Sequence, residues 1–131
     1  RQPCHRTAVK HLGADMYVRE CYHPRFWPHR TRLLDANGFE KAGKPVLHHL
    51  AGPLCFSGDF PVRRAMLPEA TAGDIVVIED VGAYTLSMWS RYNSRQMPRV
   101  LGLRQGHFSV LREREDPEDL VRFWLGGKTA G

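Results

Sequence analysis

The sequence predicts a mainly β fold, a barrel or sandwich that ends in a short helix. Many short apolar segments alternate with turns rich in glycine and proline, which number 12 and 9 in the chain. The one β-branched run, at residues 75–78, is typical of a buried strand, and a helix signature occurs only near the C-terminus. At 131 residues the chain is large enough for one domain with a core that needs no disulfides.

The first third of the chain is expected to hold short strands. Residues 1–13 show no clear period and predict an irregular or truncated lead-in, so that the β domain spans residues 14–131. A short strand is expected at residues 15–20. A second covers residues 29–36 and turns at Asn37-Gly38, where both positions tolerate positive φ.

The rest of the chain continues the same alternation. Residues 46–50 and 60–67 predict strands on either side of a loop, and residues 75–78 (Ile-Val-Val-Ile) predict a strand buried on both faces. Residues 99–112 predict a hairpin. Asp116-Pro117 then begins a helix, with an acidic cap and a proline in the first turn, which Gly126 ends.

The positive charge lies in the N-terminal part. Residues 1–50 carry nine Lys/Arg against four Asp/Glu, whereas residues 51–131 carry ten of each, so the whole net charge of +5 comes from the first 50 residues. These basic residues do not fall on one helical face and no nucleic-acid motif accompanies them. We expect a solvated or subunit-facing surface and no nucleic-acid partner.

Compartment and membrane association follow from cysteine spacing and hydropathy. The longest apolar runs are far shorter than the roughly 20 residues of a spanning helix, which predicts no membrane partner. The start of the chain has no initiator Met and no apolar signal-peptide core, so we expect a piece of a longer protein. Three widely spaced cysteines predict reduced thiols in a cytoplasmic protein.

The stretch of residues 51–95 holds the candidate chemistry. Cys55, Asp59 and Tyr84 each lie close to a glycine, where the backbone can bend sharply or let another group approach. The cysteines and seven histidines have no spacing of a closed zinc site, so no metal is expected. No spacing marks a histidine as the partner of Cys55 in a cysteine protease. Taken alone, Cys55 is better explained as a small buried hydrophobe, and Tyr84 as a side chain that closes a turn over the core.

Five short motifs change that balance. In chain order they are Arg19-Glu20-Cys21-Tyr22-His23-Pro24, Gly52-Pro53-Leu54-Cys55, Ser57-Gly58-Asp59, Gly82-Ala83-Tyr84 and Tyr92-Asn93-Ser94-Arg95. In this order and spacing, over about residues 13–115, they resemble the C-terminal domain of the pyridoxal-phosphate-dependent decarboxylases of diaminopimelate, ornithine and arginine. The resemblance implies a C-terminal β-barrel or sandwich domain, a homodimer and an amino-acid substrate, in lysine or polyamine biosynthesis.

The resemblance also implies roles for single residues. Cys55 would enter the active site of the partner subunit and donate the proton that replaces the lost carboxylate, since a thiol with a pKa of about 8.5 can do this near neutral pH. Tyr84 would contact the cofactor phosphate in its own subunit. Asp59 would pair with a lysine across the dimer interface. Tyr22 and Arg19 would hold substrate, the latter because a guanidinium grips a carboxylate.

Two features depart from the family pattern. Phe56 stands where these enzymes carry Glu or Asp against the distal amine of the substrate, which predicts a substrate with a less basic far end. The (β/α)8 barrel that carries pyridoxal 5'-phosphate is missing, and no lysine here stands in the context of the Schiff-base lysine. We therefore expect the isolated chain to be inactive. The alternative is a non-catalytic β domain that binds or regulates a full-length homologue.

Overall fold

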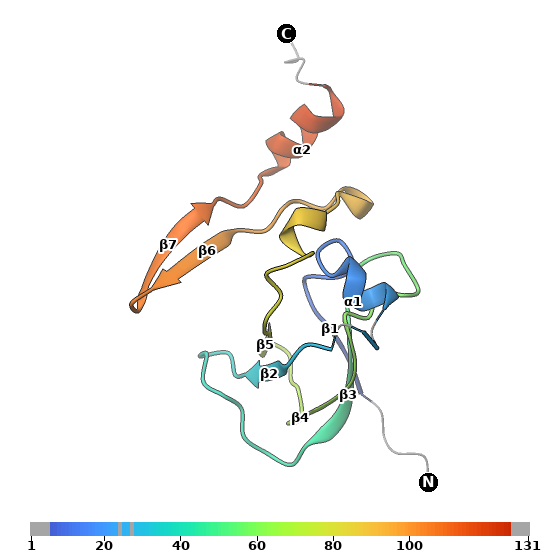
Figure 1. Cartoon of the computed structure of the whole chain (residues 1–131), viewed down its shortest axis with the longest axis vertical. Coiled ribbons are helices and arrows are strands. Elements are labelled where there is room, and N and C mark those ends of the chain that lie inside the picture. Colours follow the sequence, from blue (N-terminus) through green and yellow to red (C-terminus); the bar gives the residue numbers. More distant parts are fainter. Residues whose placement is uncertain (1–5, 24, 27, 127–131) are drawn as a thin grey trace. The chain divides into compact units, whose positions relative to one another are not determined.

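The computed structural model describes residues 6–23, 25–26 and 28–126. The chain divides into two compact units, Arg1–Ser90 and Arg91–Gly131, where the sequence predicts one domain from residue 14. Strands make up most of the regular structure of the described residues, which confirms the mainly β fold class (Figure 1). In the described residues the strands form one three-stranded and two two-stranded sheets, none of them a closed barrel.

The first unit is built on a three-stranded sheet. Strand β1 (Arg6–Val9) pairs in parallel with β3 (Val46–Ala51), and β3 pairs antiparallel with β4 (Val62–Leu67), in the order β1-β3-β4. The strand at residues 6–9 corrects the expected irregular lead-in, of which residues 1–5 lie outside the described part. Four residues are too few to show an alternating apolar pattern. This segment therefore forms a strand because its backbone pairs with β3.

A two-stranded sheet completes the first unit. Strand β2 (Thr31–Leu34) pairs antiparallel with β5 (Ile75–Ile78), and Leu34 forms one further bridge with Glu40 beyond the turn at Asn37-Gly38. Both strands confirm the prediction. The expectation that β5 is buried on both faces is wrong in this chain, because Ile75 is 44% exposed.

Helix α1 (Val18–Tyr22) replaces the strand that the sequence predicts at residues 15–20. The turn before it is closed by the amides of Met16 and Tyr17, which both donate to the Gly13 carbonyl. A helix of five residues has too few turns for a 3.6-residue period to be recognised, and its position depends on tertiary contacts.

The core of the first unit is small and includes one histidine. Leu33, Leu50 and Leu67 are almost fully buried. His48, 1% exposed, donates from Nδ1 to the Val46 carbonyl at 3.0 Å and accepts the Ala70 amide at Nε2 at 3.3 Å. Both ring nitrogens are thus used inside the fold, which gives this histidine a structural role.

The second unit contains a hairpin and a helix. Strands β6 (Val100–Arg104) and β7 (His107–Arg112) turn at Gln105-Gly106, both with positive φ, and α2 (Pro117–Trp124) follows. Asp116 accepts the Asp119 amide and Asp119 accepts the Asp116 amide, a complete capping box. The hairpin and the capped helix confirm both predictions. Two single-turn 3-10 helices, η1 (Leu86–Met88) and η2 (Tyr92–Ser94), lie before the hairpin in the chain.

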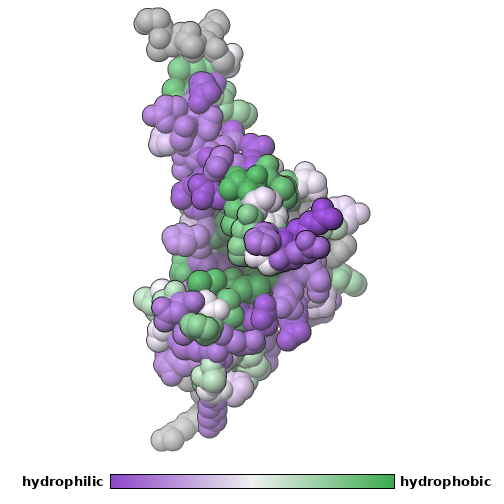
Figure 2. Space-filling view, turned by 90° about the vertical axis from the view of Figure 1, so that its left-hand side faces the viewer, coloured by the Kyte–Doolittle hydropathy of each residue, from purple (hydrophilic) through white to green (hydrophobic). Residues whose placement is uncertain are grey.

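Large apolar side chains remain exposed in both units, and Figure 2 shows apolar surface between the polar residues. Phe108 is 71% exposed and Trp124 64%. None of the helices in the described part has the length and apolar character that crossing a bilayer requires.

Candidate functional site

The candidate residues all belong to the first unit, and α1 brings several of them together. Arg19 and Tyr22 lie three residues apart, on one face of this helix. The Tyr22 ring stacks on Phe56, with centroids 5.4 Å apart and planes at 30°. The Arg19 guanidinium lies over the Tyr84 ring, with its carbon 4.3 Å from the centroid. The helix therefore touches both the cysteine loop and the tyrosine turn.

The cysteine loop, residues 52–59, is closed by its own backbone. The Gly52 amide donates to the Asp59 carbonyl at 2.9 Å, and the Asp59 amide donates to the Phe56 carbonyl at 3.0 Å. Cys55 is exposed at the tip of this loop. The Phe56 ring lies so close to Gly58 that a Cβ there would overlap it. Glycine at position 58 thus lets the ring fold back over the loop and reach Tyr22.

The Asp59 carboxylate holds this loop from inside. It is 3% exposed and accepts the Leu54 amide at 2.8 Å within the loop and the Ala14 amide at 2.7 Å from outside it. Gly13 and Gly52 form a cradle around it: a Cβ on Gly13 would be 2.5 Å from both carboxylate oxygens, and one on Gly52 would overlap them. The predicted lysine pairing of Asp59 across an interface stays a prediction.

Tyr84 occupies a strained backbone position. Its φ of 59° is in the left-handed region, which non-glycine residues adopt uncommonly. The Thr85 side chain is buried and its hydroxyl donates to the Val81 carbonyl, which closes the turn from residue 81 to 85. The phenol is 44% exposed, so its hydroxyl is within reach of an external group.

A group of polar residues beneath the loop was not predicted from the sequence. Lys10 lies over the Tyr17 ring at 4.8 Å and donates to the Leu12 carbonyl; burial lowers its pKa from 10.5 to about 8, and the nearby Asp59 carboxylate opposes that change. Burial raises the pKa of the Cys21 thiol to about 12, with Asp59 adding to the effect. The Cys21 thiol is therefore unreactive, and it is buried, whereas Cys55 is exposed. No local sequence pattern links these residues, because Gly13 and Asp59 lie 46 positions apart in the chain.

The candidate site can offer a thiol, a phenol and a guanidinium to an external ligand. A phenol with a guanidinium over its ring, as at Tyr84 and Arg19, combines a hydrogen-bond donor and a positive charge, which suits a phosphate such as that of pyridoxal phosphate. The described lysines have other positions or contacts in the fold. Lys10 is half-buried near Asp59, Lys41 contacts Asp74 at 2.5 Å, and Lys44 lies in the exposed connection before β3, while Lys128 is outside the described residues. The described residues thus fit the edge of a cofactor site.

The sheet, the cysteine loop and the tyrosine turn define a β domain of the class found in decarboxylases. Residues 6–82 match the family model of the pyridoxal-dependent decarboxylase C-terminal sheet domain. The chain therefore belongs to the pyridoxal-dependent decarboxylase family, through its C-terminal sheet domain, and that family uses pyridoxal phosphate. The sequence prediction of this family is confirmed.

Relatives of known function agree. The chain is 45% identical over 124 residues to diaminopimelate decarboxylase of Helicobacter pylori strain J99, covering 93% of this chain and 29% of the relative. It is 47% identical over 73 residues to that of Methanothermobacter thermautotrophicus, covering 56% of this chain and 17% of the relative. The chain thus spans under a third of the length of these relatives.

Solved structures give the same result for the fold. A crystal structure of diaminopimelate decarboxylase superimposes with a TM-score of 0.82 at 31% identity, covering 91% of this chain and 30% of that chain. The Helicobacter pylori enzyme complexed with L-lysine gives a TM-score of 0.78 at 32% identity, covering 93% and 29%. The β fold of both units is therefore that of a decarboxylase C-terminal domain.

Proposed function

We propose that this chain forms the C-terminal part of an amino-acid decarboxylase of the diaminopimelate type, in which Cys55 donates the proton that replaces the lost carboxylate. The observation that carries the proposal is the contact of α1 with both functional turns, Tyr22 on Phe56 and Arg19 on Tyr84. Through these contacts the loop that carries Cys55 and the Tyr84 ring both pack against α1. When bound, pyridoxal phosphate supplies the electron sink for the reaction.

The chain's own residues have distinct tasks in this proposal. The Cys55 thiol carries a proton at an exposed loop tip, from which it can enter a second subunit of a cytoplasmic homodimer. Tyr84 donates a hydrogen bond to a phosphate oxygen, and Arg19 adds positive charge beside it. Tyr22 and Phe56 cover the distal end of the amino-acid substrate. Among the described residues no lysine is placed to hold the cofactor, and we expect the isolated chain to be inactive.

The Cys55 role can be tested on the protein as its gene encodes it. Cys55→Ala should lower product formation by about a hundredfold or more, the usual contribution of a positioned general acid, with cofactor absorbance unchanged. Ser57→Ala, in the same exposed loop, is the matched control and should keep normal activity. Equal product formation by Cys55→Ala and the native protein would refute the assigned proton donor.

The Phe56 role concerns substrate choice. The ring is apolar and stacked on Tyr22, so it cannot offer the carboxylate that pairs with a distal ammonium group. The native protein should therefore prefer an amino acid with a less basic far end over diaminopimelate. Phe56→Glu should shift the ratio of kcat/KM values toward diaminopimelate by about tenfold or more, as expected for a new charge-assisted contact. An unchanged ratio across a panel of basic and apolar amino acids would contradict this role.

A further inference from the structure

A basic cleft lies on the open edge of the three-stranded sheet, and the proposed decarboxylase chemistry leaves it unexplained. Strand β4 is the last strand in the order β1-β3-β4. Along it runs a cavity of about 480 Å³, a size typical of sites for small molecules. We call it the β4 edge cleft. Its lining residues are Arg25, Pro28, His29, Thr31, Pro61, Val62, Arg63, Arg64, Ala65, Met66 and Leu67.

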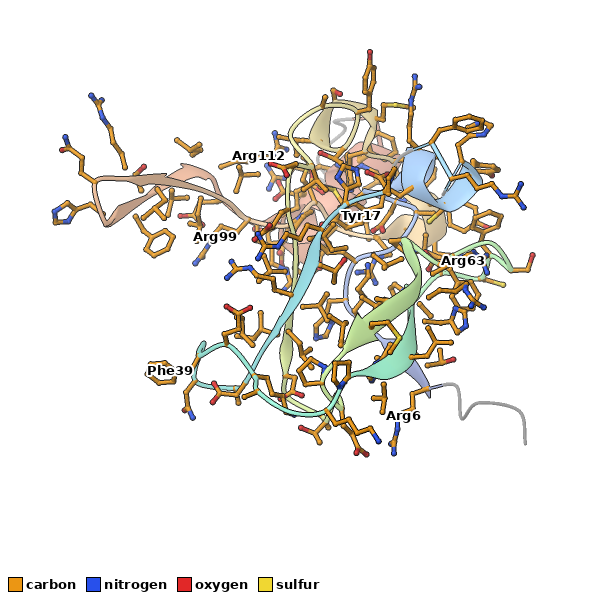
Figure 3. All side chains as sticks on the ribbon, turned by 60° about the horizontal axis from the view of Figure 1, so that its bottom comes forward. Arg6, Tyr17, Phe39, Arg63, Arg99 and Arg112 are labelled. Carbon is orange, nitrogen blue, oxygen red and sulfur yellow. The ribbon has the colours of Figure 1, made fainter. Side chains whose placement is uncertain are left out.

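A β-bulge places two consecutive arginines at this cleft. Leu50 of β3 is opposite Val62 and His48 is opposite Ala65, so Arg63 and Arg64 together face the single residue His49. In a regular strand consecutive side chains point to opposite faces. The bulge breaks that alternation, and both arginines are exposed. Figure 3 labels Arg63, whose guanidinium carbon lies 4.4 Å from the centroid of the Phe60 ring.

Arg64 holds this position at a conformational cost. Its φ is 60°, in the left-handed region, where a residue with a Cβ is disfavoured by roughly 1–2 kcal/mol. Glycine is the usual residue at such a bulge position, because it adopts this conformation without that cost. A bulge with glycine at position 64, beside Arg63, would protect the sheet edge from pairing with other strands equally well. Arg64 therefore lines the cleft at a backbone position where glycine would be less strained.

The cleft combines positive charge with apolar walls. Arg25, Arg63 and Arg64 contribute three guanidinium groups, and no acidic side chain is among the residues that the structure gives as its lining. His29 also lines it, with its ring nitrogen 3.1 Å from the buried Glu20 carboxylate. The remaining surface is formed by Thr31 and by proline, valine, alanine, methionine and leucine side chains. Guanidinium groups match the geometry of carboxylates and phosphates, and the apolar walls suit a carbon skeleton.

We propose that the β4 edge cleft binds a small organic oxyanion, a carboxylate or phosphate compound of metabolite size, through Arg63 and Arg64. The two arginines grip the anionic group while the apolar walls cover the rest of the molecule. This site contains none of the residues assigned to decarboxylation, so it does not depend on that proposal.

Isothermal titration calorimetry on the protein as its gene encodes it tests the site, at constant ionic strength maintained with chloride. Inorganic phosphate and glutarate are the two probes. Arg63→Gln and Arg64→Gly should each weaken binding by about tenfold or more, as expected for loss of a charged hydrogen-bond donor. Arg64→Gly removes the guanidinium and also relieves the positive-φ strain, so its melting temperature should stay equal or rise. Arg104→Gln, an exposed arginine outside the cleft, is the matched control and should bind within twofold of the native protein.

Each result has a defined meaning. Saturable binding of phosphate alone, or of glutarate alone, supports the site and identifies which anion it takes. The proposal is overturned if neither probe gives saturable heat, if the two cleft variants bind like the native protein, or if Arg104→Gln weakens binding as much as they do.

Discussion

Replacing Asp59 by asparagine should open the cysteine loop from the inside. The carboxylate accepts the Ala14 amide at 2.7 Å and the Leu54 amide at 2.8 Å, with one oxygen for each. Asparagine keeps the volume but has only one acceptor, so its NH₂ group must face one of the two amide donors. A buried donor left without a partner costs about 1–3 kcal/mol, and the remaining bond is weaker without the charge. We therefore expect Asp59→Asn to lower the free energy of unfolding by about 2–4 kcal/mol.

Urea denaturation measures that loss, and amide hydrogen exchange locates it. The amides of Ala14 and Leu54 should exchange much faster in the variant, whereas those of the β6–β7 hairpin should not change. Asp80→Asn is the matched control: Asp80 is exposed at a φ of 58°, which asparagine adopts readily, so its stability should change by less than about 0.5 kcal/mol. A loss below that size for Asp59→Asn, with normal exchange of both amides, would show that the carboxylate does not brace the loop.

Two further predictions concern the charges buried in each unit. Because the pKa of Lys10 falls from 10.5 to about 8 on folding, the unfolded chain binds more protons between these pH values, and stability should rise as pH increases through that window. Urea titrations should show that the free energy of unfolding rises by at most about 3 kcal/mol relative to Lys10→Met across this pH window. Taking the difference between the two proteins cancels the opposing titration of Cys21 above pH 9. Parallel stability curves for the two proteins would contradict the shift of the Lys10 pKa. In the second unit, Glu115 receives two bonds from Arg91 at 2.8 and 2.9 Å and one from the Met97 amide at 2.9 Å, so Glu115→Gln should destabilise this unit by about 2–4 kcal/mol in hydrogen exchange. Glu113→Gln breaks only the exposed pair with Arg99 and should cost less than about 1 kcal/mol; similar losses for both variants would refute the distinction.

The sequence was informative wherever the local signal was strong. The run Ile-Val-Val-Ile predicted β5, and the acidic cap with Pro117 predicted α2, because side-chain shape and capping act within a few residues. Helix α1 and strand β1 were missed for the opposite reason. Each has five residues or fewer, and contacts with distant segments determine its conformation.

In the candidate site, too, the sequence indicated some residues, whereas others became apparent only in the folded structure. The resemblance singled out Tyr22, Phe56, Arg19 and Tyr84, which the structure brings into two contacting pairs through α1. The support beneath them was invisible in the sequence. Nothing in the chain pattern announces that Lys10 or Gly13 lies beside Asp59, since only folding brings these positions together.

Because of the glycine cradle around Asp59, positions 13, 52 and 59 cannot be substituted independently of one another. A side chain at Gly13 or Gly52 would collide with the carboxylate, and Gly52 would also collide with the backbone of Gly13. In a mutational library, substitutions at positions 13 and 59 should therefore be strongly epistatic. Gly13→Ala should be harmful in the native background and milder when Asp59 is replaced by a smaller residue. Redesign of the loop that carries Cys55 would therefore have to treat positions 13, 52 and 59 together.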